Sequence, residues 1–167
     1  MLQETTNVLF AKRCLGTAVS ENYVEWALEL LEQTHDSPSL RILAGLSPPL
    51  NSFEIQGYFK KSLKELHIDE PSESDAINNY SIHLCERIIF GSIEPVTGMK
   101  ALYGIFIHLN YRSDYIVWLE LSDAVLSIKC GEDPYTYSLM NKDNIDVIIR
   151  NEAAKFLKYL KKAEQQL

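Results

Sequence analysis

The sequence predicts an all-α protein, an irregular orthogonal bundle of about seven or eight helices in a single domain over 1–167. Two patterns indicate this fold. Apolar residues recur at helical spacing along nearly the whole chain, and the segments between them are short and rich in residues that begin or end helices. With 167 residues, 46% of them hydrophobic, the chain is long enough for a packed core, and no fixed-period repeat suggests a solenoid.

Two helices are expected first, over 6–16 and from Ser20 to about 33. The second is apolar over a wide arc, and its remaining narrow face consists of four glutamates. We call this set the acidic face: Glu21, Glu25, Glu29 and Glu32. At about 100° per residue these side chains fall within about 80° of arc. No lysine or arginine lies between Ser20 and Ser39, so the acidic face is either a solvated surface or a docking surface for a basic partner.

A short helix with both ends marked is expected within 36–46. Asp36 or Ser37 can cap its first free N–H groups, and Pro38 fits the first helical position. Gly45 lies near its end, and two prolines that follow prevent continuation. The apolar residues between these ends face nearly every direction, which predicts a buried helix.

Arg41 is a permanent charge inside this short helix. A buried charge must be paired, and Asp36, Glu25 and Glu29 are close enough in sequence to be partners. We therefore expect a structural ion pair of Arg41 with Asp36, or a contact that neutralises the acidic face. An anion-binding arginine is the alternative.

Two more helices are expected over 51–66 and 72–90. Asn51 and Ser72 are each followed three residues later by an acidic residue, a spacing that resembles the capping box. Both helices carry an apolar stripe at helical spacing, which predicts one buried face for each.

The next helix, over 95–109, is apolar almost all round and is therefore expected at the centre of the domain. Gly98 and Gly104 then mark close contacts with neighbours, because an unpacked glycine inside a helix costs about 1 kcal/mol.

The stretch 115–129 leaves alternatives open. Its composition would suit a strand, but it does not alternate polar with apolar residues, so we expect one helix or two, interrupted at Ser122. The last helix is expected over 144–162, with a buried apolar stripe and a basic outer face.

Charge and cysteine content exclude several classes of protein. A net charge of -7 and a pI near 5.1 argue against nucleic-acid binding and suit either a soluble protein or one with a basic partner. Cys14, Cys85 and Cys130 form no zinc or disulfide pattern and fit reduced thiols in a cytoplasm. The first residues lack the basic start of a signal peptide, and the longest nearly apolar run, 101–109, is half a membrane span. We expect no membrane partner.

Catalytic motifs are not recognisable. Glu32 and His35 have the E-x-x-H spacing of di-iron bundles, but the chain has no second copy. His35, Asp36 and Ser37 have the residue types of a catalytic triad, but adjacent residues cannot adopt its geometry. We predict no catalytic residue, no cofactor and no metal site. An enzyme would require a site built from distant residues, with a histidine or carboxylate of raised pKa in a deep polar pocket.

Two neighbouring segments, W-A-x-x-L-L from Trp26 and D-S-P-S-L-R-I-L-A-G-L from Asp36, resemble a signature in uncharacterised bacterial proteins. The resemblance covers only the second and third expected helices and implies no catalytic residue or ligand. Small acidic bacterial proteins also include immunity proteins that neutralise toxins, which is a likeness of class rather than of motif.

Three functions remain as hypotheses. The first is a non-enzymatic protein-interaction module of a bacterial cytoplasm, for which an immunity-type inhibitor of a basic toxin is one concrete form. The second is an enzyme whose site no local motif reveals. The third is a helical subunit of a larger assembly, such as a homodimer, which would expose an apolar patch.

Overall fold

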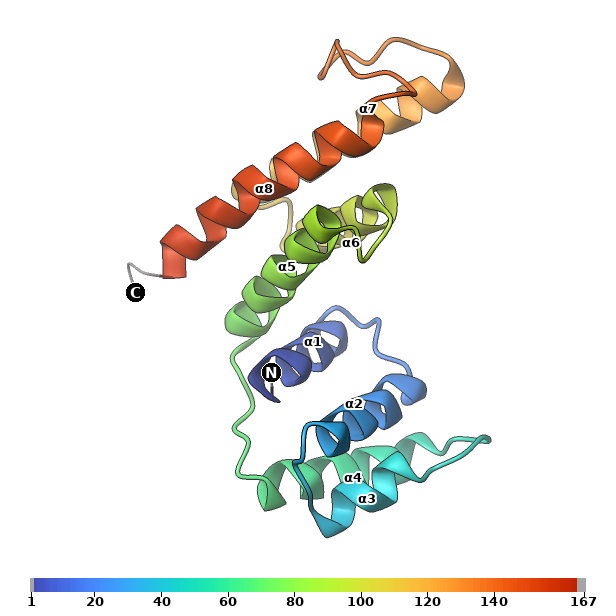
Figure 1. Ribbon diagram of the computed structural model, residues 1–167, viewed down its shortest axis with the longest axis vertical. Coiled ribbons are helices and arrows are strands. Elements are labelled where there is room, and N and C mark those ends of the chain that lie inside the picture. The colour runs from blue at the N-terminus through green and yellow to red at the C-terminus, as the bar shows by residue number, and fades with distance from the viewer. Residues whose placement is uncertain (1, 165–167) are drawn as a thin grey trace. The chain divides into compact units, whose positions relative to one another are not determined.

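The computed structural model describes residues 2–164 and is helical wherever it is regular (Figure 1). These residues form eight α-helices and one 3₁₀ helix, with no β-strand among them. The prediction of an all-α protein with about seven or eight helices is therefore confirmed.

The chain divides into two compact units, 1–80 and 81–167, and the division falls within helix α5 (Glu73–Phe90). Each unit packs its own helices around its own buried residues. The single domain expected from the sequence stays a prediction.

The first unit contains four helices and the beginning of α5. Helix α2 contacts the other three, and α3 also packs against α4. The bounds are α1 (Leu2–Cys14), α2 (Ser20–Glu32), α3 (Pro38–Ala44) and α4 (Ser52–Glu65).

An aromatic cluster fills the core of the first unit. The Phe59 side chain is fully buried, and its ring centroid lies 4.9 Å from that of Trp26 and 5.1 Å from that of Tyr23, both in edge-on geometry. The Phe10 ring lies 5.8 Å away. The indole N–H of Trp26 donates to the hydroxyl of Thr6 at 3.2 Å, so this large side chain is buried with its polar atom satisfied.

Helix α3 begins and ends where its sequence predicts. The Ser37 hydroxyl accepts a hydrogen bond from the Leu40 N–H at 3.3 Å, Pro38 is the first helical residue, and Gly45 is the C-cap. Of the two residues that could cap the helix, Ser37 does so. The predicted complete burial of this helix is wrong: Leu40 and Leu43 are fully buried, but Ile42 is 45% exposed. Contacts with α2 on one side and α4 on another leave the third side of the helix in solvent.

Glu65 holds α3 against α4, a role that sequence reasoning missed. One carboxylate oxygen accepts from the Ser39 N–H at 2.9 Å and the other from the Ser39 hydroxyl at 2.7 Å. Hydrogen bonds from Ser39, then from Ser37, lower the pKa of Glu65 below its ordinary value of 4.5. The contact joins residues 26 positions apart in the sequence, so no local sequence pattern predicts it.

This lowered pKa makes the stability of the first unit depend on pH. A carboxylate with a depressed pKa in the folded state stabilises the fold above its unfolded pKa, and that contribution is lost as the pH falls through the folded pKa. We expect Glu65→Gln to unfold at lower urea than wild type at pH 7, and the two midpoints to converge below about pH 4. Urea midpoints at pH 7, 5, 4 and 3 test this. The exposed loop variant Glu132→Gln should follow the wild-type pH dependence, and parallel curves for wild type and Glu65→Gln would contradict the assignment.

The second unit contains the end of α5, three further helices and the 3₁₀ turn η1. Helix α6 contacts η1, α7 and α8, and α7 also contacts η1 and α8. The bounds are α6 (Pro95–His108), η1 (Ser113–Tyr115), α7 (Ile116–Cys130) and α8 (Ile145–Glu164).

The ambiguous stretch is a single uninterrupted helix, α7, with no break at Ser122. It ends at Gly131, whose φ of 81° is the left-handed conformation in which glycine commonly caps a helix. Inside the unit, the fully buried Trp118 packs edge-on against Phe156 with ring centroids 5.4 Å apart. Tyr115 packs against the same ring and shares a 2.9 Å hydrogen bond with Ser81.

The two glycines of α6 have opposite surroundings. A Cβ at Gly98 would lie 2.7 Å from Ile88 Cδ1, so the predicted close contact is present there. At Gly104 the prediction is wrong, because a Cβ would have no atom within 4 Å and the residue is exposed. The two positions are about 240° apart around the helix, so they face different sides. The side of α6 that includes Gly104 and Ile107 is exposed, and the helix is covered by its neighbours only on its other sides.

Candidate functional site

The structure places all four residues of the acidic face at the surface of the first unit. Glu21, Glu25, Glu29 and Glu32 are exposed along one side of α2. The opposite side of the same helix is buried in the core through Tyr23, Trp26, Ala27 and Leu30. Burial of this second set fixes the rotation of the helix, and the glutamate spacing then determines that the carboxylates point outward.

The acidic face is not neutralised within its unit. In the described part of the chain, none of its four carboxylates forms an ion pair, and the Glu25 carboxylate accepts a single hydrogen bond, from the Asn22 amide at 3.2 Å. The last turn of α2 holds no basic residue. The negative charge of this surface therefore faces solvent.

Arg41 contacts Asp36 rather than the acidic face. Its Nε donates to one Asp36 oxygen at 2.6 Å, and its Nη2 contacts the other. The Arg41 side chain is 69% exposed, so the expectation of a buried charge is wrong. Burial of the neighbouring leucines of α3 turns position 41 outward. The hydrogen bond from Arg41 lowers the pKa of Asp36, and Asp36 in turn raises the pKa of Arg41. An exposed pair of this kind contributes little to stability.

An exposed leucine accompanies the acidic face, and sequence reasoning missed it. Leu28 is 46% exposed. It lies three residues after Glu25 and four before Glu32, and residues at these spacings are neighbours on a helix surface. Leu28 is one residue of the wide apolar arc that the sequence shows for this helix, so only the structure reveals that an apolar contact point adjoins the carboxylates.

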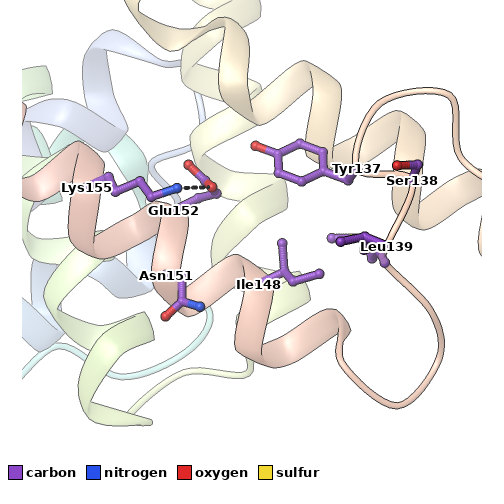
Figure 2. A pocket seen from close by; sticks show the side chains of 8 residues that line it. Tyr137, Ser138, Leu139, Ile148, Asn151, Glu152 and Lys155 are labelled. Atoms are coloured by element: carbon purple, nitrogen blue, oxygen red, sulfur yellow. Dashed lines mark hydrogen bonds and ion pairs between the residues drawn. The ribbon is translucent and has the colours of Figure 1, made fainter.

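The second unit holds a pocket of about 360 Å³ between the loop 131–144 and helix α8. Figure 2 shows the Tyr137 ring with its hydroxyl end turned toward Glu152, and Ile148 pointing toward the ring. The Glu152 carboxylate accepts from the Lys155 ammonium at 2.7 Å. The pocket is lined by Tyr137, Ser138, Leu139, Met140, Ile148, Asn151, Glu152 and Lys155.

Burial raises the pKa of Tyr137, and the carboxylates of Glu152 and Glu120 raise it further. The phenol therefore stays protonated at physiological pH. Sequence reasoning did not find this pocket, since its residues come from a loop and a helix and match no known local motif.

Groups suited to catalysis do not converge in this pocket. None of the four histidines lines it, and neither does a cysteine. Across the described residues, no three His, Cys, Asp or Glu side chains gather where they could hold a metal ion. The three cysteines are free thiols, with Cys85 buried, Cys130 exposed and Cys14 in between. Burial raises the pKa of the Cys85 thiol to about 12, which keeps it protonated and unreactive.

Comparisons with protein-family models, with curated proteins and with solved structures find no match to this chain. In the described residues, no helix combines the length and the apolar character that crossing a bilayer requires.

Proposed function

We propose that this chain is a non-enzymatic protein-interaction module that binds a basic protein through the acidic face of α2. One observation carries the proposal: four exposed carboxylates lie along one side of a well-packed helix, and no described basic side chain pairs with any of them. A cationic partner would supply the missing counter-charges.

The energetics of the helix support this proposal. Glu21 with Glu25 and Glu25 with Glu29 are like charges four residues apart, and Glu29 with Glu32 are three apart. Each such pair disfavours the helix by roughly 0.2–0.5 kcal/mol. The helix tolerates them because its other side is packed in the core, and binding of a cation at the surface relieves the repulsion.

The same surface defines the chemistry of its partner. Lysines or arginines placed around an apolar side chain would pair with the carboxylates while the apolar group covers Leu28. An immunity-type inhibitor of a basic toxin is one protein of this kind. A symmetric homodimer through this surface is disfavoured, because each copy would present the same negative charge to the other. A homodimer through another surface stays a prediction, which light scattering tests.

Neutralising the acidic face should abolish partner binding and leave the fold intact. The variant carries E21Q, E25Q, E29Q and E32Q. We expect its unfolding free energy to equal that of wild type or to rise by up to about 1.5 kcal/mol, because three like-charge pairs are removed. The measurement is capture of partners from a lysate of the native host, compared between wild type and variant, with circular dichroism as a check of the fold.

A matched control makes the same change in net charge elsewhere. Its four positions are exposed, and their side chains form no hydrogen bond or ion pair with the described residues: D69N, E132Q, D133N and D146N. The control should keep the wild-type partner, with binding that weakens as salt is added. Identical partners for wild type and the acidic-face variant, or no partner for either, would refute the proposal.

A further inference from the structure

We propose a second binding site in the pocket between the loop 131–144 and α8, one that takes a primary ammonium group on a short aliphatic chain. The pocket lies in the second unit and uses none of the acidic-face residues, so it is independent of the function proposed above.

Size and lining suit an aliphatic chain. The volume of about 360 Å³ is at the lower end of the range for small-ligand sites. Ile148 of α8 and the buried Met140 of the loop supply apolar walls, and Leu139, which is 85% exposed, lies at the rim. These walls would cover the methylene groups of a ligand.

The loop that forms one wall is held in place by its own hydrogen bonds. The Asn144 side-chain amide donates to the Leu139 carbonyl at 2.9 Å, and its oxygen accepts from the Asn141 N–H at 2.7 Å. The Met140 N–H donates to the Tyr137 carbonyl at 2.7 Å. Tyr137 itself has a φ of 60°, the left-handed conformation that non-glycine residues seldom adopt. These bonds stabilise that conformation, so the pocket wall is formed before a ligand arrives.

The charged groups of the pocket differ in their freedom to move. The Glu152 side chain is only 16% exposed, whereas its partner Lys155 is 72% exposed. An exposed ion pair between residues three apart on a helix is weak, so the lysine ammonium can swing into water at little cost. The Glu152 carboxylate is too buried to turn into water in the same way. The ammonium of a ligand can therefore take the place of Lys155 beside it.

Tyr137 adds a second feature that favours a cation. Its ring forms part of the pocket wall, and an ammonium over an aromatic ring is stabilised by the ring quadrupole. Burial raises the pKa of Tyr137 most, and the carboxylates of Glu152 and Glu120 raise it further, so negative charge lies close to the phenol. An anionic ligand would meet this charge unfavourably.

Titration with n-pentylamine, followed by ¹⁵N–¹H correlation spectra, tests the site. We expect dose-dependent shifts confined to the amides of 137–140 and 148–155, with a Kd on the order of 1 mM for so small a ligand. Pentan-1-ol has the same length without the charge, and pentanoate reverses the charge. Neither should shift these signals. Equal shifts with pentan-1-ol, or none with n-pentylamine, would overturn the proposal.

Two variants are expected to change the affinity for n-pentylamine in opposite directions. E152Q should weaken n-pentylamine binding about tenfold, because a charge-assisted contact is lost. K155A should strengthen binding about two- to fivefold, since a competing cation is removed. K158A, an exposed lysine of α8 that does not line the pocket, should leave the affinity unchanged. Weaker binding in K155A, or unchanged binding in E152Q with a wild-type spectrum, would show that the pocket does not bind a cation in this way.

The natural source of the ammonium is either a free amine or a lysine side chain. Nα-acetyl-lysine amide presents the same group at the end of a polypeptide-like side chain. Binding of both probes supports a lysine side chain as ligand, and binding of n-pentylamine alone supports a free amine. Binding of neither contradicts the site.

Discussion

Replacing Phe59 by alanine is expected to destabilise the first unit by about 3–5 kcal/mol, the usual cost of truncating a buried phenylalanine. Phe59 is fully buried on α4, and its ring contacts those of Trp26, Tyr23 and Phe10, which come from α2 and α1. Removing the ring leaves a cavity at the point where these helices meet. Because whole domains are stable by only about 5–15 kcal/mol, this is a large share of the total.

A second phenylalanine on the same helix gives a matched control. Phe53 is 89% exposed, so Phe53→Ala should change the free energy of unfolding by less than about 0.5 kcal/mol. Phe59→Leu keeps part of the core contact and should fall between the two, which keeps the comparison measurable if Phe59→Ala does not fold. Urea unfolding provides the measurement. Equal losses for Phe59→Ala and Phe53→Ala would contradict the assigned core.

The same experiment can test the single-domain prediction, because each unit contains one tryptophan. Trp26 lies in the first unit and Trp118 in the second. In a W118F background, fluorescence reports the first unit alone, and the total helical signal reports both. If the chain is one cooperative domain, Phe59→Leu shifts both transitions together. Separate transitions would show that the two units unfold independently.

Local sequence patterns predicted the ends of α3 and the start of α4 well, whereas α1 begins four residues before the predicted start. Ser37, Pro38 and Gly45 define α3 as expected, and Asn51 caps α4 by accepting from two backbone N–H groups. These features depend on residues within one turn of each other, so they can be inferred without knowledge of the tertiary structure. The acidic face is exposed for a similar reason: its spacing is that of one helix side, and the rest of the helix is apolar.

Burial was predicted less well, because composition does not reveal how many neighbours a helix has. The helices α3 and α6 are apolar enough to be surrounded, yet Ile42 and Ile107 are exposed, at 45% and 44%. Contacts between residues distant in the chain were missed altogether, including Ser39 with Glu65 and the pocket between the loop and α8. Such contacts depend on the tertiary packing of the helices, which the spacing of residues within one segment does not determine.

The same substitution at the two glycines of α6 is expected to change the free energy of unfolding in opposite directions. Gly104→Ala should stabilise the protein by about 0.5–1 kcal/mol, because alanine is the better helix former and the new methyl meets open space. Gly98→Ala gains the same propensity but places its Cβ against Cγ1 and Cδ1 of Ile88, whose side chain is fully buried. Such overpacking costs about 1–3 kcal/mol, so we expect net destabilisation. Thermal or urea unfolding of both variants tests the signs.

The contact with Ile88 can be separated from every other effect by a double-mutant cycle. Ile88→Ala alone should cost about 2–5 kcal/mol, since it opens a cavity in the second unit. In that background the atoms that would collide with the new Cβ are gone, so Gly98→Ala should stabilise the protein as Gly104→Ala does. The expected coupling between positions 88 and 98 is about 1–3 kcal/mol. Gly104→Ala should show no coupling to Ile88→Ala, because a Cβ at position 104 would have no packing neighbour within 4 Å. If Gly98→Ala remained destabilising in the Ile88→Ala background, the contact with Ile88 would not explain the need for glycine at position 98.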